Sequence, residues 1–586
     1  MPTEQTEMRR VLYFPGRAAL TASFFRSLGA LDECRLGARS GEPTVVCRET
    51  ALSFVERRTI ESFLAALHSQ YFNLVLLDLR EPVEPRGRKR KQTAFARGMA
   101  LLEAMDRETD IERRYGFHRI FALVSGPDPI EVDRQIATLG AVGVRHVMRD
   151  PSTCHHDPSC PRLPEAAAFS RQVLREMKEV CLHRQPGKIA LCVSGGGITG
   201  LYFELGVLKC LEDCLPPGTL NRLDLYFGIS AGSVLSGILA NGFSVTEFMA
   251  AIDGAGEGRI EPLDLNLLGL SHLDLRGLAA PLRQVFSLAS RGAAELLRGR
   301  LPFSLESLIF EYGDLFHAPF RTDGFGNLLR RAFSRPGHTD DFRQLPHPLF
   351  VGATDQDLKE HVLFGEPPYD EVPISVAIQA SMSINPVFAP TVIGGRYFED
   401  GAVTRTSNFP DAIRKGADLI FTIDPIVPYV SKRAGFARNR GVFYNTDQDI
   451  RTVSFTRYDT TRNWALRRHP EVSLYTFLPP NSLRRILSVN PMDHRPFREI
   501  WRGAYLGTLK RIEALGYRLR GDLRAHGIAF DPQPAMAVAA RLNAVRQPRF
   551  ADFFPDGKVE IRSVEPPAKP RATKRPARRP QAPPAA

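Results

Sequence analysis

Two segments in which an apolar run passes through glycines into a helical pattern constrain the fold more than any other feature. The first is KIALCVSGGGITG at residues 188–200, and the second is LDLYFGISAGSVLSGILANG at residues 223–242. The glycines of the first segment and the serine of the second are about 35 residues apart, which fits one helix and one strand of a βαβ unit. The pair therefore predicts an α/β domain with neighbouring parallel strands.

Ser230 in the second segment lies between Gly228 and Gly232. Glycines on both sides allow a strained turn that exposes a serine hydroxyl between a strand and a helix, and the helix N-terminus adds positive potential there. The alternative is that Ser230 is only a small residue in a tight turn. The apolar strand before it and the helical pattern after it favour a nucleophile.

The glycine run of the first segment consists of Gly195, Gly196 and Gly197. Consecutive glycines let the backbone approach a ligand, and their amides beside a helix N-terminus favour negative charge. A dinucleotide-binding loop uses the same physics, but the GxGxxG spacing and a ribose-binding acid are missing here. The run indicates a turn that stabilises negative charge.

A third motif is YFEDGAV, in which Asp400 precedes Gly401. An Asp-Gly pair alone is most often a turn. Here it follows the strand-like APTVIGG and precedes a further turn, helix and strand. We therefore expect Asp400 at a strand end, on the same edge of a parallel sheet as Ser230.

In this order the three motifs resemble those of the patatin-like phospholipase family, over roughly residues 188–428. The segments FVGATDQDLKEHVLFG and AIQASMSINPVFAP also resemble parts of that family's domain. The resemblance implies a three-layer α/β domain with a mostly parallel central sheet. It also implies a lipid acyl hydrolase of the phospholipase A or lysophospholipase type, with no cofactor and no metal.

Carried over to this sequence, the resemblance makes Ser230 the nucleophile and Asp400 the partner that takes its proton, in a dyad without histidine. The amides of Gly195, Gly196 and Gly197 would form the oxyanion hole. Such chemistry is coherent, because a serine hydroxyl needs an adjacent base and the tetrahedral intermediate needs donors already in place.

Two positions depart from the family pattern. Thr199 stands where the glycine motif commonly has Arg or Lys, and Ala402 replaces the second glycine of the aspartate motif. Loss of a cation at a helix start removes electrostatic support, so we expect lower activity or an altered preference for anionic head groups. The backbone donors remain.

Two other readings stay open. One is an α/β-hydrolase with a Ser-Asp-His triad, because His469, His494 and His526 follow Asp400 in the chain. The other is a catalytically weak patatin-fold scaffold or lipid-binding protein in which Ser230 is a turn residue.

The first 160 residues alternate strand-like and helical segments, which predicts a smaller, flavodoxin-like α/β domain. It faintly resembles a degenerate receiver domain, since Asp78 ends a strand where a receiver carries its phosphorylated aspartate. An acidic pair after the first strand is missing, and Met148 and Arg149 stand where a receiver has lysine. We expect a regulatory role without phosphorylation.

The remaining boundaries follow from composition and pattern. We expect a helical connector at 161–187, a helical insertion at about 257–320, a largely helical extension at 429–550 and a disordered basic Pro/Ala-rich tail at 560–586. In the insertion, apolar residues alternate with arginines, which predicts basic amphipathic helices. A packed cap is favoured over a lid or membrane-docking surface.

The net charge and the apolar content of the chain indicate which kinds of partner it can bind. The chain carries a formal charge of +12 with 43% apolar residues, so anionic partners are favoured, and we expect lipid or phospholipid rather than nucleic acid. Neither a secretory signal nor an apolar run of about 18 residues is evident, so a cytoplasmic protein with peripheral contact at an anionic inner membrane surface is expected. The sequence does not indicate an oligomeric state.

Cysteine usage argues against a disulfide framework, since the eight cysteines are sparse and several lie in apolar surroundings. CHHDPSC at residues 154–160 offers four metal-ligating side chains. Zinc ligand pairs usually have shorter spacing and a second pair elsewhere, so a surface loop is favoured.

Overall fold

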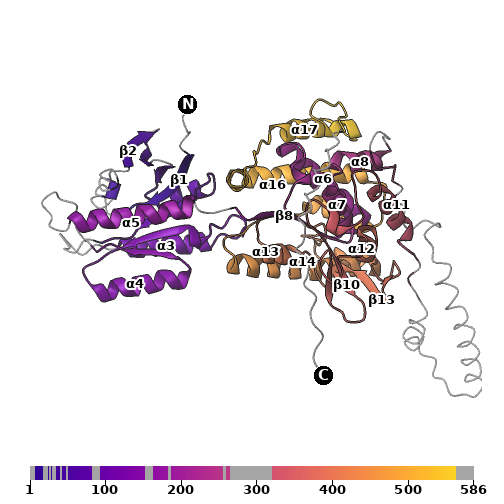
Figure 1. Ribbon diagram of the computed structural model, residues 1–586, viewed down its shortest axis with the longest axis horizontal. Coiled ribbons are helices and arrows are strands. Elements are labelled where there is room, and N and C mark those ends of the chain that lie inside the picture. Colours follow the sequence, from indigo (N-terminus) through magenta and orange to yellow (C-terminus); the bar gives the residue numbers. More distant parts are fainter. Residues whose placement is uncertain are drawn as a thin grey trace, which may run out of the picture.

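The computed structural model describes residues 7–16, 24–25, 28, 34–39, 42–47, 50–81, 93–151, 163–182, 186–254, 259–263, 265, 318 and 320–561. Within these ranges the strands form two mixed, mostly parallel sheets, one near the N-terminus and one in the second half of the chain. Each sheet has its own helices, and the two bodies lie side by side (Figure 1).

The N-terminal sheet has the strand order β2-β3-β4-β1-β5-β6-β7. Its strands are β1 (Glu7–Phe14), β2 (Cys34–Arg39), β3 (Glu42–Cys47), β4 (Thr50–Glu56), β5 (Leu74–Asp78), β6 (Ile120–Val124) and β7 (His146–Arg149). Strands β4, β1, β5, β6 and β7 are parallel, and the antiparallel pair β2 and β3 extends the β4 edge. Without that pair, the parallel order is 2-1-3-4-5, as in flavodoxin-like sheets.

Helices cover both faces of this sheet because its strands are apolar on both sides. Helices α2 (Ile60–Leu67), α3 (Ala94–Asp106) and α4 (Pro129–Val142) share a core with alternate strand residues such as Leu12. The opposite face, which includes Val11, packs against α5 (Leu163–Leu182). The segment expected as a connector is thus a helix that also covers one face of the N-terminal sheet.

Asp78 occupies the strand end at which a receiver domain would be phosphorylated, but its carboxylate is already bound. Its two oxygens accept hydrogen bonds from Nε and Nη2 of Arg80 at 2.8 and 2.9 Å, and Oδ2 accepts a third from Tyr13 at 3.0 Å. Arg80 is fully buried and also contacts Asp150 at 2.8 Å. This pairing neutralises the carboxylate inside the domain.

The second sheet has the order β12-β13-β10-β9-β8-β14-β15, with β11 paired to β10. Its strands are β8 (Lys188–Val193), β9 (Leu225–Ile229), β10 (Leu349–Asp355), β11 (His361–Phe364), β12 (Thr391–Ile393), β13 (Arg396–Asp400), β14 (Ala417–Ile423) and β15 (Ser473–Phe477). Strands β10, β9, β8, β14 and β15 are parallel, whereas β11, β12 and β13 are antiparallel to their neighbours. The C-terminal extension therefore contributes β15 to this sheet.

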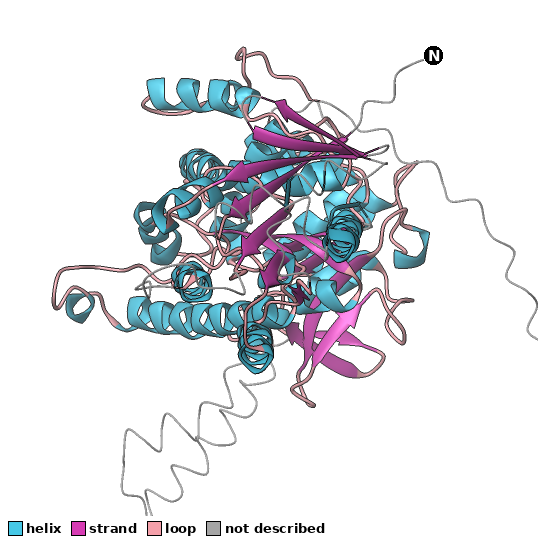
Figure 2. Ribbon diagram, turned by 90° about the vertical axis from the view of Figure 1, so that its left-hand side faces the viewer, coloured by secondary structure: helices cyan, strands magenta, loops and turns pink. Residues whose placement is uncertain are grey.

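Helices pack against both faces of the second sheet. Figure 2, which views the molecule from the side of the N-terminal body, shows helices on either side of the strands. One core contains α6 (Gly197–Cys214), α7 (Ala231–Ala240) and α16 (Phe497–Ala525), and the other contains α13 (Phe409–Arg414) and α14 (Val442–Arg468). The first face also has α8 (Val245–Asp253), α11 (Asp323–Phe333), α12 (Ile374–Ser381), α15 (Asn481–Val489) and α17 (Gln533–Ala544).

Helix α6 follows the glycine run, and α16 holds it against the sheet. A methyl group on Gly206 would lie 2.6 Å from Cβ of Ala504 and 2.7 Å from the carbonyl of Trp501, so only glycine permits this approach. The tight contact fixes the helix that begins at the candidate oxyanion turn.

Several expectations lie outside the described residues: the CHHDPSC loop, most of the insertion at 257–320 and the tail from residue 562. Among the helices that the structure describes, none has both the length and the apolar composition needed to cross a membrane.

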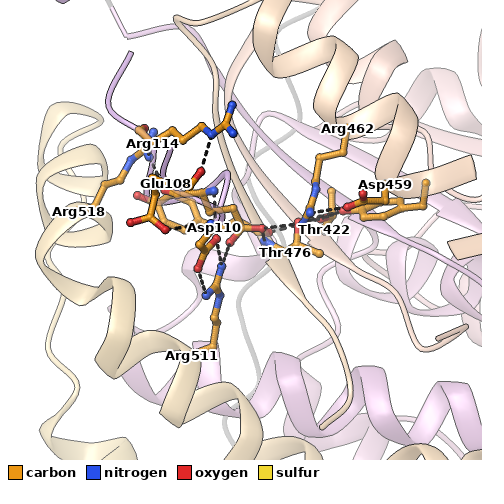
Figure 3. Close-up of polar contacts among 12 residues, drawn as sticks. Glu108, Asp110, Arg114, Thr422, Asp459, Arg462, Thr476, Arg511 and Arg518 are labelled. Atoms are coloured by element: carbon orange, nitrogen blue, oxygen red, sulfur yellow. Dashed lines mark hydrogen bonds and ion pairs between the residues drawn. The ribbon is translucent and has the colours of Figure 1, made fainter. Parts of the chain in front are cut away.

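A buried carboxylate joins the two bodies. Glu112, in the loop after α3, is 2% exposed and accepts hydrogen bonds from the backbone N–H of Thr476 at 2.9 Å and from Nη2 of Arg511 at 2.7 Å. Both Nη atoms of Arg511 also donate hydrogen bonds to the Asp110 carboxylate, at 2.7 and 3.1 Å. Arg462 forms an ion pair with Glu112 (Figure 3). One arginine of α16 therefore neutralises two carboxylates of the N-terminal body.

We expect Arg511→Ala to lower the free energy of unfolding by about 3 kcal/mol, because Glu112 would stay buried without its main partner. Lys510→Ala removes an exposed charge from the next position of the same helix and is the matched control. Urea unfolding of both variants checks this. Equal stability of Arg511→Ala and the control would contradict the role given to Arg511.

Candidate active site

Ser230 connects β9 to α7 in a conformation that few non-glycine residues adopt. Its φ is 51° and its ψ is −127°, and Lys359 is the only other non-glycine residue with positive φ in the described part of the chain. Such a backbone costs of order 1–3 kcal/mol and persists only where the surroundings enforce it. The strained strand-to-helix turn expected from the GxSxG motif is present.

The two flanking glycines are required by close contacts. A methyl group on Gly228 would lie 2.4 Å from Cα of Ser233, and one on Gly232 would lie 2.3 Å from the carbonyl oxygen of Ser194. Both distances are shorter than any Cβ contact can be. The turn therefore depends on glycine before and after Ser230.

The glycine run lies directly beside Ser230. A methyl group on Gly195 would be 2.6 Å from Cβ of Ser230 and 3.2 Å from its Oγ. Gly196 is the N-cap of α6, and Gly197 has a φ of 66°. Within the described part of the chain, the N–H groups of Gly195 and Gly196 have no hydrogen-bond acceptor. These donors lie next to the serine at the positive end of a helix.

The strand that carries Asp400 runs in the opposite direction to the one expected from the sequence. Asp400 ends β13, which is antiparallel to β10, so the expectation of a parallel strand end was wrong. Strand β10 lies between β9 and β13 and pairs Gly352 with Ile229 and Ala353 with Asp400. Gly352 and Ala353 are neighbours in β10, so Asp400 at the end of β13 lies level with Ile229, the residue before Ser230.

Asp400 is 2% exposed, and its carboxylate lies close enough to the Ser230 side chain for that side chain to lower its pKa. Its Oδ1 accepts a hydrogen bond from the Ala402 N–H at 2.8 Å. Burial raises the pKa of Asp400 to about 6, although Ser230 and the Ala402 N–H oppose that rise, and the charge of Glu399 adds to it. The carboxylate is thus ionised at neutral pH and is a stronger base than an exposed aspartate.

Ser381, in α12, supports the turn and was not identified as a site residue from the sequence. The Ser230 N–H donates to Oγ of Ser381 at 2.8 Å, and that hydroxyl donates to the carbonyl of Gly352 at 2.6 Å. The segment AIQASMSINP contains Ser381, so its resemblance to the family was the available signal. No local pattern indicates a bond across 151 positions.

We expect Ser381→Ala to leave the Ser230 amide buried without an acceptor, at a cost of about 1–3 kcal/mol, and to lower turnover by roughly tenfold. Ser383→Ala is the control, because Ser383 is equally buried and its Oγ donates to the Gln379 carbonyl at 3.0 Å without contacting Ser230. Steady-state rates of both variants decide this. Unchanged turnover in Ser381→Ala would remove the residue from the site.

Thr199, in the first turn of α6, is buried where the family pattern commonly has a basic residue. Its N–H donates to the carbonyl of Pro491 at 3.0 Å, and its hydroxyl has no partner within the described residues. The neighbouring Oγ of Ser194 is likewise buried without one. No cation therefore stands at this position, and the turn relies on backbone amides.

The three histidines of the alternative triad form no hydrogen bond with Ser230 or Asp400. His469 pairs with Glu471 at 3.1 Å, and His526 pairs with Asp418 at 2.8 Å. His494 is exposed. Among the described residues there is also no group of three or more His, Cys, Asp or Glu side chains arranged to hold a metal ion.

Comparisons with known proteins bear on this site. The model of the family "Patatin-like phospholipase" matches residues 191–413, which include the glycine run, Ser230 and Asp400. No curated protein matches the chain.

Solved structures give distant similarities. VipD from Legionella pneumophila is 13% identical, covering 63% of this chain and 83% of its own, with a TM-score of 0.24. Human GIVD cytosolic phospholipase A2 is 13% identical, covering 58% and 60%, with a TM-score of 0.27. ExoU from Pseudomonas aeruginosa, solved with SpcU, is 14% identical, covering 63% and 66%, with a TM-score of 0.23. By the family match, residues 191–413 of this α/β protein form a patatin-like phospholipase domain that follows an N-terminal α/β domain.

Proposed function

We propose that the protein is a serine lipid acyl hydrolase that cleaves carboxylic esters of lipids through an acyl-enzyme on a Ser230–Asp400 dyad. The observation that carries the proposal is the position of the buried Asp400 beside the strained Ser230: neighbouring residues of β10 pair with Ile229 and with Asp400, and the Ser230 side chain lowers the pKa of the Asp400 carboxyl. The patatin-like family of the domain supports a lipid as the substrate class.

In the first half-reaction Asp400 accepts the Ser230 proton while Oγ attacks the ester carbonyl carbon. The carbonyl oxygen becomes an oxyanion, and the amides of Gly195, Gly196 and Gly197 are the proposed donors that stabilise it. When the carbon–oxygen bond to the alcohol breaks, Asp400 returns the proton to that alcohol. The products are a free alcohol or lysolipid and an acyl group on Ser230.

In the second half-reaction Asp400 takes a proton from water, whose oxygen attacks the acyl carbon. The bond to Oγ then breaks, and the proton passes back to Ser230. The net change is one ester plus water giving an alcohol and a fatty acid, so no cofactor is needed. Strain in the turn keeps Oγ facing the site throughout the cycle.

The rival readings have less support. A Ser-Asp-His triad needs a histidine that hydrogen-bonds to the serine hydroxyl. His469, His494 and His526 form no hydrogen bond with Ser230 or Asp400. The scaffold reading leaves a costly backbone conformation and two free glycine amides without a purpose. We also infer that the N-terminal domain is flavodoxin-like and regulatory, and that the protein acts at the surface of an anionic membrane, where its substrate lies.

We expect kcat/KM to rise as pH increases from 5 to 7, with a midpoint near pH 6. The general base must be ionised, and burial raises the pKa of Asp400 to about 6, so protonation removes activity below that value. Rates with a soluble short-chain ester across this range check the profile. A rate that stays constant down to pH 4.5 would contradict Asp400 as the base.

Product analysis tests the proposed function most broadly. Purified protein is incubated with vesicles of mixed phosphatidylcholine and phosphatidylglycerol, and the lipids are analysed by mass spectrometry. Fatty acid and lysolipid should accumulate with the wild type and not with Ser230→Ala. Equal products from both proteins, or none from either with any acyl ester, would reject it.

A further inference from the structure

A cavity of about 600 Å³ lies between the N-terminal domain and the C-terminal extension that follows the patatin-like domain and completes the second body. One wall is formed by α3 and by the loop that carries Glu112, and the other by the end of α14 and the start of β15. Its volume falls within the range of about 300–1,000 Å³ that is usual for small-molecule sites. It lies outside the Ser230 site, because none of its lining residues belongs to the motifs around the serine.

The walls are largely apolar, with contributions from both domains. The apolar lining residues include Met99, Leu102, Met105, Ile111, Phe117, Val142, Leu466, Val472 and Leu474. Several of these side chains are buried in their own domain cores, so the cavity is a gap in otherwise well-packed structure. Apolar walls with a few polar groups are the usual environment of an apolar ligand body.

The charged groups of the cavity do not balance. Each lining carboxylate has an arginine partner: Glu103 pairs with Arg107 at 3.6 Å, Asp106 with Arg114 at 3.7 Å, and Glu112 with Arg511 at 2.7 Å. Arg518 donates to the carbonyl of Arg114 at 3.0 Å, and both residues lie at this junction in Figure 3.

Two further lining arginines, Arg145 and Arg467, come from different domains and are exposed. In the part of the chain that the structure describes, neither has an ion-pair or hydrogen-bond partner. Because both are exposed and line the cavity, they lie at its open side. The cavity thus combines an apolar interior with an unneutralised positive charge at its entrance.

His118 adds a neutral polar group to the same wall. Its ring lies against Gly116, and its Nδ1 is buried with no partner among the described residues. Burial and the nearby arginine charges lower the pKa of His118 to about 3, so the ring is uncharged at neutral pH and adds no charge to the cavity wall.

We propose that this cavity binds a single-chain amphiphile with an anionic head group, of the fatty-acid class. The chain would lie against the apolar walls, and the carboxylate would meet Arg145 and Arg467 at the entrance. Because the walls come from both domains, the ligand would favour their docked arrangement. If the ligand is the fatty acid that the proposed function releases, the reaction product would stabilise this arrangement, and that step rests on the proposed function. Binding of a fatty acid to the cavity does not depend on turnover.

A fatty acid that carries a diazirine in its chain locates the site directly. The full-length protein is irradiated with this probe, digested and analysed by mass spectrometry. Labels are expected on the peptides that contain residues 99–118 or 466–474, and unlabelled dodecanoate should compete them away. Labels confined to peptides around Ser230 and Asp400, or no saturable label at all, would overturn the proposal.

Substitutions at the entrance test the head-group contact. The double variant Arg145→Ala/Arg467→Ala should lower cavity labelling and dodecanoate affinity at least fivefold. Arg524→Ala is the control and should change neither, because Arg524 is exposed and lines a different pocket, between the N-terminal domain and α16. Thermal unfolding confirms that each variant is folded. An equal loss in Arg524→Ala, or equal affinity for dodecanol and dodecanoate, would overturn the assignment of the two arginines.

Val142→Trp provides a second route, because Val142 lines the cavity, is 39% exposed and can be enlarged without disturbing a core. The added ring should occupy part of the cavity and reduce labelling at least fivefold. Undiminished labelling in this folded variant would place the ligand elsewhere. Hydrolysis without cavity labelling would reject this inference alone, and cavity labelling without hydrolysis would reject only the proposed function.

Discussion

Ser230→Ala is expected to lower the turnover of acyl esters by at least about 10⁴-fold, because the variant has no atom that can form the acyl-enzyme. The change removes one oxygen at a site that is 9% exposed, so the fold should be retained. Turnover of a fluorogenic acyl ester and thermal unfolding, measured on the same preparation, check both parts.

Ser236→Ala is the matched control for that variant. Ser236 lies in the same helix, is fully buried, and its Oγ donates to the Phe227 carbonyl at 2.8 Å without touching Ser230. It should keep most of the activity. If Ser230→Ala and Ser236→Ala lose activity equally, the loss reflects packing and the nucleophile lies elsewhere.

Asp400→Asn is the second change with a large expected effect, and we expect kcat to fall by about 10³–10⁴-fold. The amide can still accept the Ala402 N–H, so the strand end should keep its conformation, but it cannot take the serine proton. Steady-state kinetics at pH 5 and pH 7 check this, because the remaining rate should no longer follow a midpoint near pH 6.

Asp424→Asn separates base chemistry from general loss of a buried charge. Asp424 is also fully buried, and burial likewise raises its pKa to about 6, but its Oδ1 accepts the Ile426 N–H rather than a bond from Ser230. Most of the activity should remain. The double variant Ser230→Ala/Asp400→Asn should be no slower than Ser230→Ala, since residues that act as one unit are not additive. Additive losses would contradict a dyad.

The local parts of the site could be predicted from sequence because each is specified by neighbours in the chain. A glycine on each side of Ser230 allows a positive φ, and consecutive glycines before a helical pattern produce free amides. Both features depend on residues only a few positions apart, so the sequence motifs predict them. The order of the three motifs then indicated the family of the domain.

The long-range parts could not be predicted in the same way. The sequence placed Asp400 on a parallel strand, but strand direction depends on how the chain returns to the sheet, and β13 enters antiparallel to β10. Ser381 contacts the Ser230 amide across 151 positions, and Glu112 meets Arg511 across 399. Periodicity and spacing report on neighbours along the chain and carry no information on such pairs.

The N-terminal domain shows the same division. Alternating strands and helices predicted a small α/β sheet, and the parallel strands follow the expected pattern. The extra antiparallel pair β2 and β3 was not anticipated, because short strands of mixed polarity give little periodic signal. Arg80, which binds the Asp78 carboxylate, lies only two positions away, yet it also pairs with Asp150, which follows β7 two strands along the sheet.

Covalent labelling with an alkyl fluorophosphonate tests the central claim most directly. Such a reagent reacts with an activated serine and leaves a phosphonyl group on its oxygen, which peptide mass spectrometry locates. The Ser230–Asp400 dyad predicts one adduct on the peptide that contains Ser230, a much slower reaction in Asp400→Asn and no adduct on that peptide in Ser230→Ala. An adduct on a different serine in a fully active protein, or rapid labelling of Ser230 in Asp400→Asn, would contradict it.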